Sequence, residues 1–132
     1  FQIDKWNGGT VDLYETAKQN EYTLLMFWAS WCHKCEQEMP NIGPMYAKHG
    51  YKGFEVIGIS LDQVKGTWEK AIADNGMTWP NVSQLQAWNS PVVADYKVTA
   101  TPTYFLLDKE GKIVLKPKRY FEVDKFLNEN LK

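Results

Sequence analysis

The segment FWASWCHKCEQEMP, residues 27–40, holds both cysteines of the chain, Cys32 and Cys35, three positions apart. A disulfide between them would close a loop of about four residues, too short to restrict the unfolded chain much, so a structural staple is the poorest interpretation. A structural zinc site needs about four ligands. The two histidines, His33 and His49, do not stand at ligand spacing from the thiols. We therefore predict a reactive dithiol and no metal site.

The sequence on both sides of this segment is typical of a buried sheet. Residues 22–28 and 54–59 are almost continuously apolar, which predicts two central strands covered on both faces. Between them, apolar residues recur every three or four positions from Met39 to His49, which predicts a helix over residues 32–50. The cysteine pair is therefore expected at the first turn of a helix that follows a central strand.

The rest of the chain alternates helical and strand patterns. We expect a helix that ends at Asn75-Gly76, an irregular insert with one helical turn at 77–90, a short helix at 91–96 and a β-hairpin at 103–116. A closing amphipathic helix is expected from the spacing of apolar Val123, Phe126, Leu127 and Leu131. This alternation predicts an α/β fold in a single domain, residues 1–132.

The composition restricts the partners. The 15 basic and 16 acidic residues are scattered, so no broad basic surface and no nucleic-acid partner is expected. No apolar run approaches the roughly 18–20 residues that cross a bilayer, so no membrane contact is expected within this sequence. The chain opens with FQID instead of Met and a basic region. We therefore expect a signal peptide, an anchor or an upstream domain to be missing.

The expected position of the cysteines assigns them different roles. A cysteine attacks as a thiolate, and the unpaired N–H groups and dipole of a helix N-terminus favour the thiolate. Cys32 is therefore predicted to be the nucleophile. Cys35, one turn further on, is predicted to be shielded by the helix yet able to attack the mixed disulfide and release the reduced substrate.

The charges around the pair act in opposite directions. His33 and Lys34 stand between the cysteines and, when positively charged, tune the site by stabilising the thiolate, which makes the couple more oxidising. Glu36 and Glu38 on the following turn oppose them. The sign of the sum stays open, as does the alternative that His33 and Lys34 are solvated loop residues of minor effect.

A proline stands directly before the strand that is expected to border the pair. In VTATPTYFLLDKEG, residues 98–111, the Thr101-Pro102 bond is either cis, which would present the backbone of Thr101 to a bound peptide, or part of an ordinary trans turn. By composition alone, an ordinary turn with a trans bond is the default.

At this point the chain resembles a known family. FWASWCHKCEQEMP resembles the active-site segment of the thioredoxin superfamily, with W-C-x-x-C after a strand and a proline five residues beyond Cys35. Thr101 and Pro102 resemble its cis-proline loop, and TPTYFLLDKEGKIV resembles the hairpin that follows. The similarity covers residues 10–131. It implies a central mixed sheet flanked by helices, with substrate docking at Trp31, Thr101 and Pro102.

Two features are similar to the TlpA/ResA group of extracytoplasmic reductases. GISLD at 58–62 precedes a helix, and the stretch from Gln63 to Val98 inserts between the second central strand and the cis-proline loop. Met26 stands where plain thioredoxin carries a buried aspartate. Glu38 matches a glutamate of ResA-like proteins, so the resemblance makes it the candidate proton acceptor for Cys35. An acid of the first helical turn, paired with the dipole, is the alternative interpretation of Glu38.

The resemblance implies a thiol-disulfide oxidoreductase that reduces protein disulfides through the Cys-His-Lys-Cys dithiol. It needs no cofactor, because a redox partner protein renews the electrons. It is expected outside the cytoplasmic membrane, either periplasmic or held by the missing N-terminal segment. The alternatives are a disulfide oxidase or isomerase of the same fold, and a binding module without turnover.

Peroxiredoxins share the fold, but residues 25–32 lack the proline of the P-x-x-x-[ST]-x-x-C motif, and the sole arginine, Arg119, lies near the C-terminus, so peroxidase activity is a weak alternative.

Trp28 is expected to pack in the core. Trp79 and Trp88 in the insert either line a partner surface or cap the core, and the sequence leaves both open.

Overall fold

The computed structural model describes residues 1–131. Its centre is a five-stranded sheet of order β5-β4-β3-β6-β7, and β1 and β2 form a separate hairpin. The strands are β1 (Gln2–Asp4), β2 (Thr10–Asp12), β3 (Tyr22–Trp28), β4 (Phe54–Ser60), β5 (Asn81–Ser83), β6 (Thr103–Leu107) and β7 (Ile113–Leu115). The helices are α1 (Leu13–Gln19), α2 (His33–His49), α3 (Lys65–Asp74), α4 (Pro91–Asp95) and α5 (Tyr120–Asn130), with short 3₁₀ turns at Gly50–Lys52 and Ala87–Asn89.

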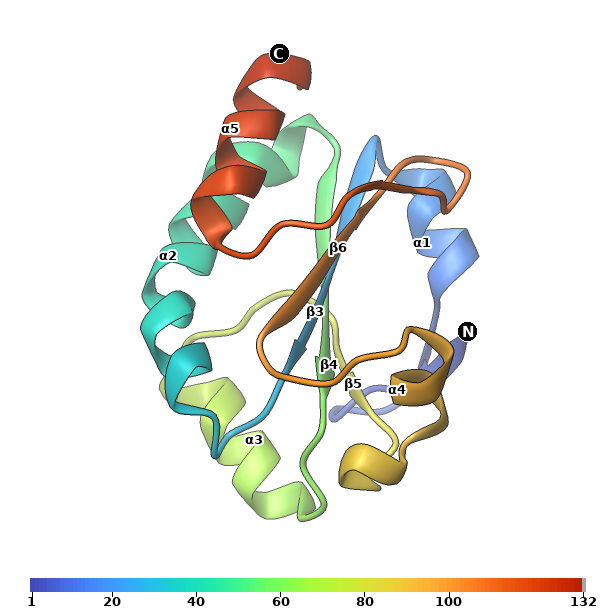
Figure 1. The fold of residues 1–132 in the computed structure, drawn as a ribbon, viewed down its shortest axis with the longest axis vertical. Helices are drawn as coiled ribbons and strands as arrows, with labels where there is room; N and C mark the ends of the chain where they lie inside the picture. The colour runs from blue at the N-terminus through green and yellow to red at the C-terminus, as the bar shows by residue number, and fades with distance from the viewer. Residues whose placement is uncertain (132) are drawn as a thin grey trace.

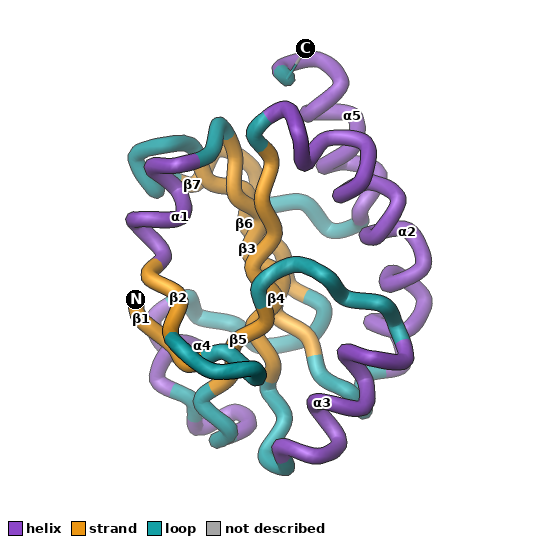
Figure 2. The backbone as a smooth tube through the Cα atoms, turned by 180° about the vertical axis from the view of Figure 1, so that it is seen from behind, coloured by secondary structure: helices purple, strands orange, loops and turns teal. Residues whose placement is uncertain are grey.

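The two runs predicted as central strands occupy the middle of the sheet. β3 pairs with β4 in parallel and with β6 antiparallel, so the sheet is mixed. Helices α2, α3 and α5 lie on one face and α1 and α4 on the other, as Figures 1 and 2 show from opposite sides. Burial on both faces explains why β3 and β4 show no alternation of polar and apolar residues.

Helix α2 follows β3 directly and spans the residues that the apolar spacing predicts. Cys32 is its N-cap residue, and the buried stripe includes Met39, Ile42 and Met45. Pro40 and Pro44 lie inside the helix and remove two backbone donors. The helix nevertheless continues to His49, because its apolar face packs against β4 and α5.

The insert at 77–90 is more regular than predicted. It contains β5, an edge strand parallel to β4, and only the turn at Ala87–Asn89 is helical. The strand has three residues, and two of them are buried polar residues: Asn81 Nδ2 donates to the Trp79 carbonyl at 2.9 Å, and Ser83 Oγ donates to the Ser60 carbonyl at 2.8 Å. Side-chain hydrogen bonds to the backbone satisfy these two donors, while Asn81 Oδ1 has no partner within the described residues. Because two of its three residues are polar, the strand lacks the apolar pattern by which a strand is predicted.

The N-terminal hairpin and α1 also carry no clear pattern in the sequence. β1 and β2 have three residues each, and Lys5 bridges to Val82 of β5, which places the hairpin beside that edge of the sheet. No helix within residues 1–131 combines the length and apolar character that crossing a membrane requires.

Candidate active site

The two cysteines form a disulfide at the N-terminus of α2, with their Cα atoms 5.2 Å apart. The backbone N–H of Cys35 donates to Cys32 Sγ at 3.2 Å, so the sulfur of the N-cap residue accepts the bond that a capping side chain usually accepts. Cys32 is 6% exposed and Cys35 1%. Cys32 is therefore the sulfur that solvent and substrate reach first.

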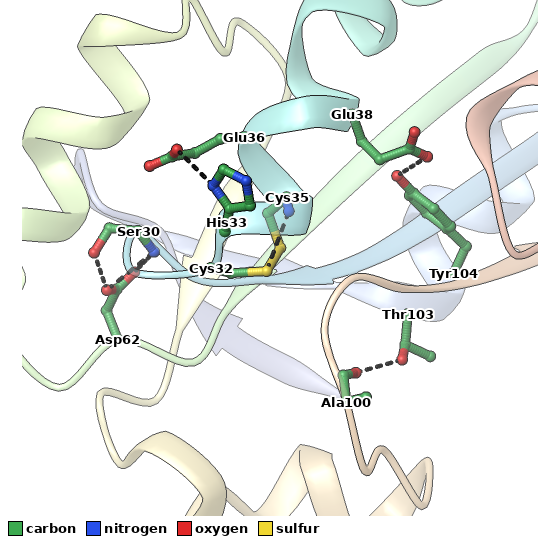
Figure 3. The surroundings of a disulfide bond; sticks show 10 residues. All are labelled: Ser30, Cys32, His33, Cys35, Glu36, Glu38, Asp62, Ala100, Thr103 and Tyr104. Atoms are coloured by element: carbon green, nitrogen blue, oxygen red, sulfur yellow. Dashed lines mark hydrogen bonds and ion pairs between the residues drawn. A yellow bond between two sulfur atoms is a disulfide. The ribbon is translucent and has the colours of Figure 1, made fainter.

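The loop between β3 and α2 is held by the buried carboxylate of Asp62, just beyond the end of β4. Asp62 accepts hydrogen bonds from the backbone N–H of Ser30 at 3.2 Å, from the Ser30 hydroxyl at 2.5 Å and from the Ser60 hydroxyl at 2.6 Å. Figure 3 shows the Ser30 and Asp62 part of this cluster beside the cysteine pair. Because β3 and β4 are parallel, their carboxyl ends meet at one edge, and Asp62 ties the two ends together.

Glu38 lies one turn beyond Cys35 and is 3% exposed. Its Oε1 accepts from the Tyr104 hydroxyl and from the Tyr120 backbone N–H, both at 2.9 Å, and its Oε2 accepts from Arg119 Nε at 3.0 Å. In Figure 3 the carboxylate points toward Tyr104 and away from the disulfide. The interpretation of Glu38 as a first-turn acid is wrong, since Glu36 occupies that turn.

Tyr104 is a neutral donor to this carboxylate. Burial raises the pKa of its hydroxyl, and the negative charge of Glu38 raises that pKa further. The hydroxyl therefore keeps its proton throughout the physiological range and continues to donate to Glu38.

Arg119 lies at the site, although its place near the C-terminus suggested otherwise. The chain returns from β7 across the N-terminal half of α2, which brings Arg119 to Glu38 over 81 residues of sequence. Its side chain is 57% exposed, against 4% for that of Glu38. The position of Arg119 near the C-terminus is thus no argument against peroxidase activity. The absence of the proline of the peroxiredoxin motif remains an argument against it.

The two residues between the cysteines point to solvent or to a cavity. His33 Nδ1 lies 3.8 Å from the Glu36 carboxylate, and both side chains are largely exposed. Lys34 lines a cavity of about 350 Å³ together with Thr101 and Pro102. His33 thus faces an opposing charge in open solvent, while Lys34 faces the proline loop.

The loop before β6 approaches the same end of β3. Phe27 pairs with Thr103 in the sheet, so the residues before Thr103 continue past the end of β3 toward the cysteine loop. The Thr101–Pro102 peptide bond is cis, and the Thr103 hydroxyl donates to the Ala100 carbonyl at 2.6 Å. Thr101 and Pro102, two of the predicted docking residues, therefore share a cavity wall with Lys34 of the cysteine motif. Figure 3 shows their neighbours Ala100 and Thr103 on this loop.

The tryptophans divide into two groups. Trp28 and Trp79 are 1% and 2% exposed and belong to the core, as predicted for Trp28. Trp31 and Trp88 are 56% and 44% exposed, and their ring centroids lie 6.4 Å apart. Trp88 of the insert thus extends the aromatic surface that Trp31 begins next to Cys32.

Asp62, Tyr104 and Arg119 complete the surroundings of the pair, and none of them was predicted as a site residue. Asp62 stands in the GISLD segment, and that strand-end aspartate was the signal available for it. Tyr104 reads as an ordinary strand residue, and only the tertiary structure brings it to Glu38. Among residues 1–131 no group of three or more His, Cys, Asp or Glu side chains is arranged to hold a metal ion.

Residues 1–116 match the AhpC/TSA family. The thiol-disulfide oxidoreductase ResA of Bacillus thuringiensis (strain Al Hakam) is 33% identical over 114 residues, which are 86% of this chain and 63% of that protein. ResA of Geobacillus thermodenitrificans is 36% identical over 90 residues, 68% of this chain and 50% of that protein. The chain thus spans less than two thirds of the length of these relatives.

Two solved structures extend the similarity to the whole chain. The thioredoxin domain of a thiol-disulfide oxidoreductase from Bacteroides vulgatus has a TM-score of 0.90 at 27% identity and covers 100% of this chain and 93% of that one. A thiol-disulfide oxidoreductase from Bacteroides fragilis has a TM-score of 0.83 at 30% identity and covers 98% and 95%.

Proposed function

Because the chain belongs to the AhpC/TSA family, we propose that it is a thiol-disulfide oxidoreductase that reduces protein disulfides through Cys32 and Cys35. The fold supports this proposal, since the mixed sheet and the structural neighbours confirm the predicted thioredoxin-like architecture. The observation that carries it is the bonded cysteine pair at the N-terminus of α2, where the Cys35 N–H already donates to Cys32 Sγ.

The chemistry follows from this geometry. In the reduced protein, the helix N-terminus stabilises the Cys32 thiolate, which attacks one sulfur of the substrate disulfide and expels the first substrate thiolate. The Cys35 thiolate then attacks Cys32 Sγ, forms the Cys32–Cys35 bond and expels the second. The substrate gains two electrons, which the protein loses, and its two thiolates take up one proton that Cys35 released and one from solvent. A redox partner protein returns the electrons, so the cycle needs no cofactor.

Glu38 is the proposed acceptor of the Cys35 proton. Its position three residues after Cys35 on α2 supports this role. Its carboxylate points away from the disulfide and accepts from Tyr104, Arg119 and Tyr120, so the proton would reach it through an intervening group rather than directly. His33 and Lys34 are the proposed residues that tune the thiolate, since they flank Cys32 at the helix start. These roles rest on position, and Glu38→Gln tests the first: the mixed disulfide should resolve more slowly, with a changed pH profile.

Substrate docking is proposed at Trp31, Thr101 and Pro102, with Trp88 as an addition from the structure. The exposed rings of Trp31 and Trp88 form an aromatic surface that includes the residue directly before Cys32. Thr101 and Pro102 line the cavity that Lys34 shares. A segment of the substrate that reaches Cys32 would contact both surfaces.

The decisive experiment compares two cysteine variants. Cys32→Ser should abolish reduction of a protein disulfide, whereas Cys35→Ser should accumulate a mixed disulfide between substrate and Cys32, visible by mass spectrometry. Disulfide reduction that persists in Cys32→Ser would overturn the assignment. Absence of selective reaction of Cys32 with a thiol reagent near neutral pH would favour a binding module without turnover.

The direction of electron flow is part of the proposal and has its own test. The N-terminus of α2 and Lys34 favour the thiolate and hence a more oxidising couple, while Glu36 opposes them. Equilibration in glutathione buffers, followed by tryptophan fluorescence, measures the potential of the pair. A strongly reducing potential supports the reductase, whereas a markedly oxidising one assigns an oxidase or isomerase.

The proposed location is outside the cytoplasmic membrane. It rests on the resemblance to the TlpA/ResA group. Its test is the compartment in which an antibody detects the native protein after cell fractionation.

A further inference from the structure

The cavity beside the cysteine pair has an excess of positive charge. Its lining includes Lys34, Lys118 and Arg119, with Glu38 as the one carboxylate, and it measures about 350 Å³. Lys34 belongs to the cysteine motif, and Thr101 and Pro102 form another part of the wall. The cavity thus lies where a substrate segment bound at the pair would pass.

The carboxylate of Glu38, the one negative charge in the lining of this cavity, is fully hydrogen-bonded within the protein. Both oxygens of Glu38 accept hydrogen bonds, and Arg119 Nε supplies one of them at 3.0 Å. Glu38 is buried and cannot turn toward a ligand without losing these partners. The charge left for a ligand to meet is therefore that of the arginine and the two lysines.

Arg119 is held on two sides and open on the rest. Glu38 occupies its Nε edge, and its Cζ lies 5.5 Å from the centroid of the Phe121 ring. In the described part of the chain, Glu38 is the one carboxylate that pairs with Arg119. The Arg119 side chain is 57% exposed. The terminal N–H groups of a guanidinium oriented in this way form a planar fork, which matches a carboxylate better than a lysine ammonium does.

We propose that this cavity is a carboxylate-binding subsite, in which Arg119 binds an Asp or Glu side chain that flanks the disulfide of the substrate. The inference rests on the proposed function and adds the class of substrate: protein disulfides with an acidic residue beside a cysteine. Lys34 and Lys118 add attraction at longer range. Glu38 is in this respect a positioning residue, because it orients Arg119.

The test uses two synthetic peptides, each with one disulfide, that differ only in Glu or Gln next to a cysteine. Both are acetylated and amidated, so the side chain carries the only carboxylate in question. The pre-reduced protein reduces each peptide in single turnover, and each rate is divided by the rate with dithiothreitol, which removes the intrinsic effect of the charge on the disulfide.

The corrected reduction rate of the Glu peptide should be about ten times that of the Gln peptide for the wild-type protein. This factor is the scale of one charge-assisted hydrogen bond. It should fall to about one in Arg119→Gln, and to an intermediate value of about three in Arg119→Lys, which keeps the charge but loses the fork. Lys125→Gln, which removes an exposed charge from α5, is the matched control and should keep the wild-type ratio. Raising the ionic strength should lower the ratio.

The outcomes separate the two levels of the proposal. Equal reduction of both peptides by the wild-type protein, or an unchanged ratio in Arg119→Gln, overturns the subsite and leaves the oxidoreductase intact. Reduction of neither peptide overturns both. The ratio also separates recognition from a merely structural role of Arg119, because a loss of folded protein lowers both rates equally.

Discussion

Asp62 and Glu38 are both buried carboxylates near the cysteine pair, and their hydrogen-bond partners differ in kind. Asp62 accepts from two hydroxyls and one backbone N–H, all neutral, and all supplied by Ser30 and Ser60 at the ends of two adjacent strands. Glu38 accepts from a tyrosine hydroxyl, a backbone N–H and an exposed arginine, all of which come from the last third of the chain.

The difference suggests separate roles: the Asp62 cluster supports the cysteine loop, and the Glu38 cluster is proposed to take part in substrate recognition. The Asp62 cluster is closed, since its donors turn inward and hold the loop that carries Cys32. The Glu38 cluster is open on one side, because Arg119 is exposed and borders a cavity next to Lys34. Substitution of Asp62 is therefore expected to change the stability of the fold. Substitution of Glu38 is expected to change both the stability and the choice of substrate.

The largest expected effect comes from breaking the closed cluster. Asp62→Ala leaves the Ser30 and Ser60 donors without their acceptor and should lower the free energy of unfolding by about 3 kcal/mol. Asp62→Asn should cost only about 1 kcal/mol, because the rotatable hydroxyls of the two serines can donate to or accept from an amide. Urea denaturation measures both. Equal losses in the two variants would mean that the cluster needs the charge.

The matched change at the open cluster is Glu38→Gln. Its amide can still accept from Tyr104 and Tyr120, but its NH₂ group would face Arg119 Nε, so two donors oppose each other. We expect a loss of about 2 kcal/mol in the free energy of unfolding, more than for Asp62→Asn. The same variant should reduce the preference for the Glu peptide. A smaller loss than that of Asp62→Asn would contradict the contrast between the clusters.

Tyr104→Phe sharpens the comparison. It deletes the hydroxyl that donates to Glu38 Oε1 and should cost about 1 kcal/mol. In a double-mutant cycle it should couple to Glu38→Gln and be additive with Asp62→Asn, because it shares a partner only with the first. Coupling of similar size to both would show that the two clusters act as one unit.

The smallest effect is expected at Asp124, a third carboxylate, which serves as a reference. It belongs to α5 and contacts His49 at the C-terminal end of α2, far from the cysteine pair. Its Oδ1 lies 2.9 Å from His49 Nε2. Burial raises the pKa of Asp124, but the His49 hydrogen bond and the Lys48 charge outweigh it and hold that pKa below its ordinary value of 3.8. A lowered folded pKa stabilises the protein above the unfolded pKa, and this contribution disappears as the pH falls through the folded value.

Asp124→Asn should therefore cost less than about 1 kcal/mol near pH 7, since the pair is partly exposed. The difference between wild type and variant should shrink as the pH falls below the ordinary pKa of 3.8, and disappear once the pH is below the folded pKa. Denaturation curves across this range measure it. A difference that grows on acidification would show that the sign of the linkage is wrong.

Much of the fold could be predicted from local pattern. The central strands, α2, α3, the hairpin and α5 have strong periodicity or clear end signals, and each is present. β5 and the N-terminal hairpin were not predicted, because strands of three residues are too short to show a periodicity, and in β5 two of the three residues are polar and buried. Ser90 is the N-cap residue of α4, but its hydroxyl donates backward to the Ala87 carbonyl instead of capping the helix.

The sequence by itself determined the prediction of a reactive pair. Two cysteines three positions apart, at the start of a helix after a buried strand, allow little besides dithiol chemistry, because the spacing is too short for a staple and the ligands for zinc are missing. Only the tertiary structure decided what surrounds that pair. Contacts such as Glu38 to Arg119, or Trp31 to Trp88, join segments far apart in the chain, and no local pattern encodes them. Where the chain returns to its own active site depends on how all the layers pack, and that packing brings the last third of the chain to the cysteines.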